Sequence, residues 1–172
     1  MSKKFALMRD LTTKAKQSKF YLSILNKLMW AAIPFNKPHR FTIALIKDDE
    51  VRVTAKYRKK NLNHLRGIHA CAIATIGEYA SGVLLISNLD PAEYRLIMAK
   101  IEIDYVYQAK SSITAIASLT EEQKQKNILE PLQNEEAVFT TMEVPIHDAQ
   151  DNLIATVKVK WQIKLWKSVR TK

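Results

Sequence analysis

The feature that most constrains the fold is the run from residue 67 to residue 89, GIHACAIATIGEYASGVLLISNL, where Glu78 is the only Asp, Glu, Lys or Arg. A run of this length is long enough to cross a membrane. A membrane span is nevertheless the poorer interpretation, because a Glu, a His and several Ser, Gly and Asn residues interrupt the run and strongly alternating segments follow it. We therefore expect a helix that is apolar on most sides and lies at the centre of a soluble domain.

Segments with the period of β-strands lie on both sides of this helix. The clearest is 155–165, where apolar residues alternate with Lys, Thr and Gln. The other predicted strands are 41–47, 51–57, 98–107, 113–119 and 137–146. The acidic KDDE between the first two predicts a hairpin turn, and Pro145 indicates that the last of them is an edge strand or carries a bulge.

Two more helices complete the predicted order of elements. One long amphipathic helix is expected over 5–33, ended by Pro34, and a short one over 120–133. Strands joined by short links favour an antiparallel sheet, and the central helix must be covered. The predicted class is therefore α+β, with one sheet curled around one helix. We expect a single domain over 1–172, with an N-terminal helical extension at 1–36 and the core at 37–172.

The net charge of +10 is unevenly distributed along the chain. Residues 1–66 contain 16 Lys/Arg and 4 Asp/Glu, whereas residues 67–172 contain 11 and 13, so the basic character belongs to the first third. This indicates a phosphate-bearing ligand, nucleic acid or an anionic membrane as a partner, or else a solvated basic helix. The first residues lack the uninterrupted apolar core of a signal peptide, so a cytoplasmic location is expected.

Candidate chemistry centres on Glu78, because a carboxylate in an apolar helix is costly to bury unless it is paired, hydrogen-bonded or protonated. His69 lies at the start of the same helix, where free backbone N–H groups can stabilise an oxyanion. Asn63 lies in the loop that enters the helix. The single cysteine, Cys71, excludes an intrachain disulfide and is expected to be an inert small hydrophobe.

The stretch NHLRGIHACAIATIGEYASG, residues 63–82, resembles the signature of hotdog-fold acyl-CoA thioesterases of the phenylacetate-degradation type, and is most similar to an uncharacterised branch of them. Asn63, Gly67, His69 and Glu78 have the family's spacing. Two departures are that Ala70 and Cys71 replace a pair of glycines, and that the acid is Glu where Asp is commoner.

The resemblance implies a hotdog fold and the hydrolysis of an acyl thioester bound to coenzyme A or to a carrier protein. Glu78 would activate water or attack the carbonyl directly, and Asn63 would orient the water or the carboxylate. His69 would hold the loop or contact the thioester, while Gly67 and Ala70 would position the substrate and supply oxyanion-binding N–H groups. The site would form between two subunits, in a dimer or a dimer of dimers.

Phosphates of the carrier would meet basic residues near this site, and neither a metal nor a cofactor is expected. The candidates for these phosphate contacts are Arg58, Lys59, Lys60, Arg66 and Lys110.

Two other hypotheses remain open at this stage. The Ala70–Cys71 replacement is compatible with a catalytically silent hotdog protein that binds an acyl group or only assembles. The basic first third is also compatible with a module that binds a membrane surface or nucleic acid, since a basic amphipathic helix over 5–33 can lie in a lipid interface. Nucleic acid is not an expected partner, because no helix-turn-helix, zinc-finger or aromatic sheet signature is present in the sequence.

Overall fold

The computed structural model describes the backbone of residues 3–169 and side chains from residue 6 onward, so residues 1–2 and 170–172 of the predicted domain lie outside the described part. The helices are α1 (Lys3–Gln17), α2 (Lys19–Ala32), α3 (Ala70–Asn88) and α4 (Glu121–Lys124). The strands are β1 (Thr42–Ile46), β2 (Glu50–Ala55), β3 (Tyr94–Tyr105), β4 (Ile113–Ser118), β5 (Val138–Asp148) and β6 (Leu153–Leu165).

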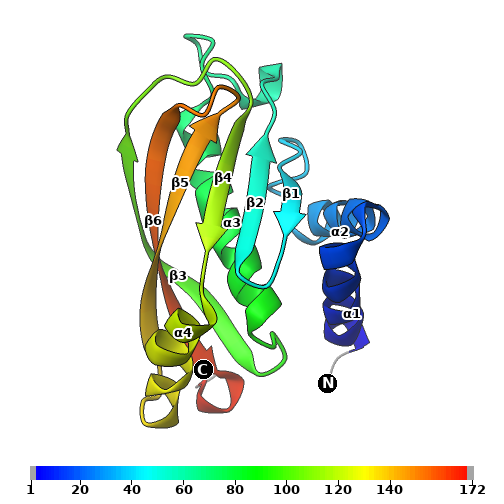
Figure 1. Cartoon of the computed structure of the whole chain (residues 1–172), viewed down its shortest axis with the longest axis vertical. Helices are drawn as coiled ribbons and strands as arrows, with labels where there is room; N and C mark the ends of the chain where they lie inside the picture. The colour runs from blue at the N-terminus through cyan, green and yellow to red at the C-terminus, as the bar shows by residue number, and fades with distance from the viewer. Residues whose placement is uncertain (1–2, 170–172) are drawn as a thin grey trace.

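One six-stranded sheet, in the order β1-β2-β4-β5-β6-β3, forms the frame of the molecule, and every neighbouring pair is antiparallel (Figure 1). The helix α3 lies along one face of the sheet and packs against five of its strands. The inward side chains of β6 are buried, while lysines alternate with them on the outer face. The predicted α+β class and hotdog fold are confirmed: a long helix wrapped by an antiparallel sheet.

The helix α3 is the buried helix that the sequence predicts. Its length and composition would suit a membrane span, but 61% of its most apolar window is buried inside the protein, as in the core helix of a soluble domain. Gly77 lets the helix approach β6 closely, since a Cβ there would lie 2.7 Å from Val157 Cβ. This contact fixes the height of the next residue, Glu78, above the sheet.

The prediction of one helix over 5–33 is wrong. The chain breaks at Ser18, which has an extended backbone with φ −140° and ψ 122°, and two helices result. The break lets each helix bury its own apolar side chains, Leu11 and Ala15 in α1 and Leu25 and Met29 in α2.

The helix α2 is held against the edge strand β1 by two side chains. The buried Asn26 accepts from the N–H of Ile43 at 2.7 Å and donates to the carbonyl of Ile43 at 2.9 Å, as a neighbouring strand would. Trp30 Nε1 donates to the carbonyl of Phe41 at 2.6 Å. Because these bonds satisfy β1 on its open side, the N-terminal extension is fixed to the sheet edge (Figure 1).

Two smaller expectations also change. The segment predicted as a helix over 120–133 is a short α4 capped by Thr120, followed by a π-helical turn at Gln125–Leu129 and a 3₁₀ turn at Pro131–Gln133. Of the two alternatives predicted for the strand with Pro145, the edge strand is wrong, because β5 lies between β4 and β6, whereas the bulge agrees with a register shift in its pairing with β6. Its pairing with β4 stops at Ile146, so the missing N–H of Pro145 costs no bond to β4, and a register shift follows between Ile146 and His147.

Candidate functional site

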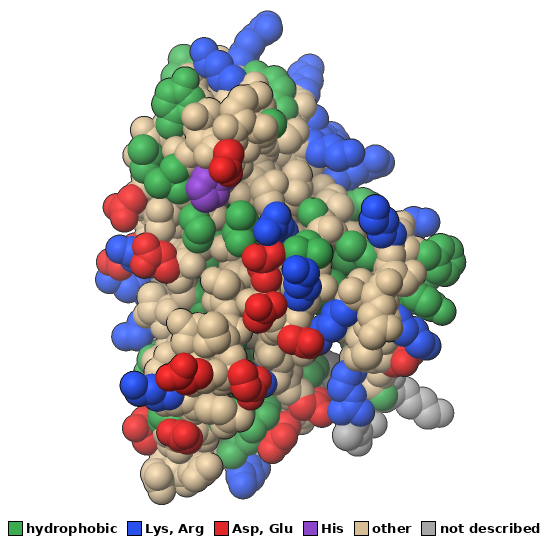
Figure 2. Space-filling view, in the orientation of Figure 1, with side chains coloured by type: hydrophobic (Ala, Val, Ile, Leu, Met, Phe, Trp, Pro, Cys, Tyr) green, Lys and Arg blue, Asp and Glu red, His purple; other side chains and the backbone are tan. Residues whose placement is uncertain are grey.

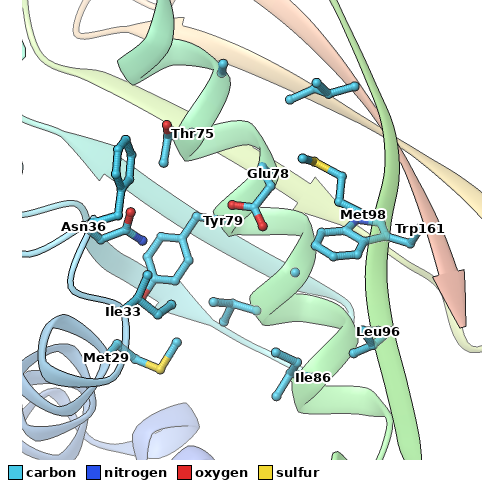
Figure 3. Close-up of a pocket in the computed structure, with 15 residues that line it drawn as sticks. Met29, Ile33, Asn36, Thr75, Glu78, Tyr79, Ile86, Leu96, Met98 and Trp161 are labelled. Atoms are coloured by element: carbon cyan, nitrogen blue, oxygen red, sulfur yellow. The ribbon is translucent and has the colours of Figure 1, made fainter. Parts of the chain in front are cut away.

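A cavity of about 490 Å³ opens between α3, the inner faces of β3 and β6, and the segment that follows α2 (Figure 3). Its walls are mostly apolar, and Trp161 and Met98 lie across the cavity from the 33–36 segment. We call it the Glu78 cavity, because Glu78 is the only charged side chain among the described residues of its wall. Its lining residues are Met29, Ile33, Phe35, Asn36, Ala74, Thr75, Glu78, Tyr79, Gly82, Val83, Ile86, Leu96, Met98, Ile101 and Trp161.

Glu78 is half-buried, and its carboxylate points into this space (Figure 3). Burial raises the pKa of the Glu78 carboxyl above its usual value. Among residues 3–169, no side chain forms an ion pair or hydrogen bond with its carboxylate oxygens, so nothing on the described chain offsets that burial. A carboxylate with a raised pKa is a stronger base than an ordinary one, as a general base requires.

Asn36 and Tyr79 add further polar groups to the wall of the cavity. Asn36 is only 3% exposed, and Figure 3 shows its amide pointing toward the same space from the segment after α2. The hydroxyl of Tyr79 is buried with no hydrogen-bond partner in the described chain. Burial, and secondly the charge of Glu78, raise the pKa of that Tyr79 hydroxyl, so it stays protonated. Asn36 does not stand out in the sequence, where its only signal is its place between Pro34 and Pro38 in a tight turn.

His69 forms the N-cap of α3, and its Nδ1 accepts from the N–H of Cys71 at 3.0 Å. Because Nδ1 acts as the acceptor, the proton of the neutral ring belongs on Nε2, which is then a donor. The backbone N–H of His69 is bonded to the carbonyl of Asn61 at 2.8 Å and is not free for an oxyanion. In the described chain, the N–H of Ala70 has no acceptor. The N–H of Gly67, the other predicted oxyanion donor, is bonded to Asn63 Oδ1 at 3.0 Å, so that part of the prediction is wrong and only the N–H of Ala70 remains available.

A second pocket of about 220 Å³ adjoins the N-terminus of α3, and we call it the His69 pocket. It is lined by Phe35, His39, Phe41, Lys60, Leu62, His69, Cys71, Ala72 and Thr75. Phe35 and Thr75 also line the Glu78 cavity, so the two spaces share a wall. Cys71, which the sequence predicts to be an inert small hydrophobe, is exposed and lines this pocket.

Asn63 lines neither space, because it closes its own loop. Its Oδ1 accepts from the N–H groups of Leu65 and Gly67, each at 3.0 Å, while its own N–H donates to the carbonyl of Gly67. A Cβ at Gly67 would lie 2.8 Å from Gln108 Cγ, so glycine here allows the loop to pack closely. Within one chain, the structure therefore does not bring Asn63 and Glu78 together.

Asn61, which the sequence analysis did not single out, joins the parts of the site. Its side chain is buried, with Nδ2 donating to the carbonyls of Lys56 and His39 and Oδ1 lying 3.1 Å from His39 Nδ1. Its own carbonyl accepts from His69. These bonds tie the segment after α2 and the end of β2 to the start of α3, and no local pattern could have revealed them.

The predicted phosphate-binding residues do not form one group. Arg58 and Lys60 line a cleft of about 520 Å³, the basic cleft, together with Lys27, Trp30, Ala31, Lys37, Pro38 and Arg40. Lys59 and Arg66 are exposed but do not line it. Lys110 lies at a separate polar pocket with Asp148 and Gln150. In the described part of the chain, no three His, Cys, Asp or Glu residues gather to hold a metal ion.

Comparisons with known proteins agree with this architecture. A family model described as "Domain of unknown function (DUF4442)" matches residues 22–163. No curated protein matches the chain.

Solved structures share the fold at low sequence identity. A Pseudomonas aeruginosa protein of unknown function, described as a probable thioesterase, is 20% identical with a TM-score of 0.76, over 83% of this chain and 95% of that one. A thioesterase from Haemophilus influenzae is 12% identical with a TM-score of 0.65, over 87% and 94%. A Chlorobaculum tepidum protein of unknown function is 14% identical with a TM-score of 0.71, over 87% and 98%.

Proposed function

The chain belongs to the DUF4442 family and has a hotdog fold, and from this premise we propose that it is a thioesterase that hydrolyses acyl thioesters with Glu78 as general base. The observation that carries the proposal is the Glu78 carboxylate, which is half-buried, unpaired in the described chain, and directed into an apolar cavity. Structures described as thioesterases share the fold and support the reaction class.

In the proposed reaction, Glu78 takes a proton from a water molecule whose oxygen attacks the carbonyl carbon of the thioester. The carbonyl oxygen becomes an oxyanion, which the N–H of Ala70 and the Nε2–H of His69 stabilise together with the N-terminal end of the α3 dipole. Collapse breaks the C–S bond, and the thiolate takes up the proton that Glu78 accepted from the water, which restores the Glu78 carboxylate. The products are a carboxylic acid and a free thiol.

These two parts of the machinery cannot serve one carbonyl within a single chain. Glu78 follows Ala70 by eight positions on the same helix, which separates them by about 12 Å along the axis at 1.5 Å per residue. The proposal therefore includes a homodimer, in which the start of α3 in one subunit faces Glu78 of the other. In such a dimer the side-chain NH₂ of Asn63, which has no acceptor in the described chain, is free to orient the water or the carboxylate.

The open edge of β3 is the proposed dimer contact. It is the last strand of the sheet, and Ile97, Met98 and Tyr105 on it are exposed. A long apolar edge strand invites pairing with another chain. Met98 and Ile101 also line the Glu78 cavity, so a partner bound at this edge would lie beside that cavity.

A panel of acyl-CoA and acyl-N-acetylcysteamine thioesters, assayed by thiol release, tests the function. We expect turnover of at least one acyl group and a fall in kcat of about 10²–10⁴-fold in Glu78→Gln, the usual contribution of a general base. The matched control is Glu143→Gln, which removes a carboxylate from an exposed position on β5. No turnover across the panel, or equal kcat in Glu78→Gln and the control, would support the catalytically silent alternative.

A further inference from the structure

We propose that the exposed side of α2 docks on the surface of an anionic lipid bilayer and so makes the chain a peripheral membrane protein. This inference does not rest on the proposed function. It concerns the side of α2 that faces away from β1 and the sheet (Figure 1). The sequence allows a lipid contact anywhere on one helix over 5–33, and the structure narrows the candidate surface to this side of α2.

The exposed side of α2, which we call the outward face, is largely apolar. Seven of the fourteen residues of α2 are exposed, and none of the seven is acidic. Four of them are apolar and the other three are two lysines and a serine: Phe20, Leu28, Ala31 and Ala32, with Lys19, Lys27 and Ser23. Phe20 is 69% exposed and Leu28 is 40% exposed. Since a surface helix normally turns a polar face to water, this face indicates a partner that offers an apolar environment.

The apolar side chains of the outward face lie together. At about 100° per residue, Phe20, Leu28 and Ala31 project within about 80° of one another, and they extend over about 17 Å of the helix axis at 1.5 Å per residue. The buried Leu25 and Met29 project from the opposite side, toward the rest of the protein. The outward side chains therefore form a strip that the docking of α2 on the sheet leaves uncovered.

The charge around this strip requires an anionic partner. Residues 11–47 contain seven Lys/Arg and no Asp or Glu. Two of the seven pair with Asp10 and Asp48, whereas five form no ion pair within residues 3–169: Lys19, Lys27, Lys37, Arg40 and Lys47. Lys27 and Ala31 belong to both the outward face and the basic cleft, so cations and apolar side chains form one continuous surface. Figure 2 shows hydrophobic side chains at the right-hand edge of the N-terminal helices, with Lys and Arg above and below them.

A bilayer with anionic headgroups satisfies both requirements at once. Its phosphates would meet the cations, while Phe20 and Leu28 would reach the boundary between headgroups and acyl chains, as in helices that lie in the plane of an interface. A second copy of this face would set the same uncompensated cations against one another. Nucleic acid would pair with the cations but would offer Leu28 and Ala31 no apolar phase. The proposed dimer leaves the face free, because α2 docks on β1 and β3 is the other edge of the sheet.

The outward face lies next to the Glu78 cavity. Met29 and Ile33, at the C-terminal end of α2, line that cavity from the opposite side of the helix. A bilayer on the outward face would therefore be about one helix diameter from the cavity, roughly 10 Å. The walls of the cavity are mostly apolar, so docking would hold an apolar binding space beside a reservoir of apolar chains.

Sedimentation of the full chain with lipid vesicles tests the inference without any need for turnover. One set of vesicles is phosphatidylcholine alone, and the other is phosphatidylcholine mixed with phosphatidylglycerol. We expect binding to the mixed vesicles that weakens as salt is added. Binding to the neutral vesicles should be at least about tenfold weaker, since each Lys or Arg near an anionic surface contributes about fivefold. No binding to the mixed vesicles would overturn the inference.

A first pair of variants tests the apolar strip. Phe20→Ser/Leu28→Ser removes its two large side chains. The matched control is Phe139→Ser/Leu153→Ser, which removes a Phe that is 51% exposed from β5 and a Leu that is 39% exposed from β6. We expect the Kd for mixed vesicles to rise at least about tenfold in the first variant and less than about threefold in the control. Equal binding by the two would overturn the inference, because the contact would then not involve α2.

A second pair of variants tests the charge. Lys19→Gln/Lys27→Gln removes two cations from the outward face, and the control Lys126→Gln/Lys167→Gln removes two exposed lysines elsewhere. We expect the Kd for mixed vesicles to rise about 25-fold in the first variant, at about fivefold for each lysine, and less than about threefold in the control. All these positions are exposed, so the folded state should be retained, which melting curves would verify. An equal Kd in the two lysine variants would contradict the proposed surface.

Two further measurements separate this inference from its alternatives. Light scattering would show a smaller oligomer in Phe20→Ser/Leu28→Ser than in its control if a second copy covered the face. That result, together with no vesicle binding by the parent, would overturn the inference in favour of self-association through α2. A parent chain that binds mixed vesicles through this face but hydrolyses no thioester would support the inference and overturn the proposed function.

Discussion

The close contact between α3 and β6 predicts how Gly77→Ala changes the stability of the fold, and the geometry decides whether that change is a loss or a gain. Replacing Gly77 with Ala puts a Cβ 2.7 Å from both Cβ and Cγ2 of Val157 and 2.9 Å from its Cγ1. Carbon atoms in contact prefer about 3.5–4.0 Å, so the helix and the strand must separate by roughly 1 Å. Val157 is fully buried, and β6 is held between β5 and β3, so the strand has little freedom to move away.

The expected result of Gly77→Ala is a net loss of stability. Overpacking of a rigid site costs up to about 3 kcal/mol, and the better helix propensity of Ala returns about 1 kcal/mol. A net loss of about 2 kcal/mol lowers the Tm of a chain of this size by roughly 4–8 °C. Because Glu78 is the next residue, the same shift should lower kcat/KM of the proposed thioesterase, up to about 100-fold for a displacement near 1 Å.

Thermal and urea denaturation of four proteins would check this reasoning: the parent, Gly77→Ala, Val157→Ala and the double variant. Val157→Ala removes the two Cγ atoms but leaves its Cβ, so the double variant should recover part of the loss rather than all of it. If Gly77→Ala alone raised the Tm, as Gly→Ala does on an unobstructed helix, the close packing of α3 on β6 would be refuted.

Three further predictions concern the same region. Because burial raises the pKa of Glu78, the folded state loses stability as the pH rises from the ordinary carboxyl pKa through the raised pKa. Glu78→Gln should remove that loss, which a pH series of denaturation midpoints would measure. A parallel pH dependence of the midpoint in the parent and in Glu78→Gln would contradict this prediction. Gly67→Ala should cost less than about 1 kcal/mol, since the clash is with the exposed side chain of Gln108, and the cost should disappear in a Gln108→Ala background when measured as a double-mutant cycle. Ser81→Ala leaves the buried Nε1–H of Trp161 without its acceptor and should cost about 1–3 kcal/mol in urea denaturation; an unchanged midpoint would mean that this bond is dispensable.

The sequence was sufficient for the elements whose pattern is local. Residues 67–89 predict a buried helix because their composition leaves no polar face, and α3 occupies 70–88. The alternation in 155–165 predicts β6 because a strand that is buried on one face must repeat every second residue. The hairpin of β1 and β2 follows from two short strands separated by a charged turn.

Features that depend on distant partners could not be predicted in this way. The break at Ser18 has no proline or glycine to mark it, and its cause is the docking of α2 on β1 through Asn26 and Trp30. The role of Asn61 depends on bonds to His39 and His69, which belong to segments on either side of it. Single polar residues of this kind look like ordinary loop residues until their partners are known.

The site residues also divide into those that a local sequence pattern reveals and those that it does not. This division affects how the N-terminal extension is interpreted. Glu78 stands out in the sequence because it is alone in an apolar helix, whereas Asn36, Lys27 and Trp30 do not stand out at all. Yet Asn36 contributes to the wall of the Glu78 cavity, and Lys27 and Trp30 contribute to the basic cleft. A boundary drawn at residue 36 would remove side chains from both spaces and would expose the edge of β1 that Asn26 covers. The extension is therefore better understood as part of the proposed substrate site than as an addition to a finished core.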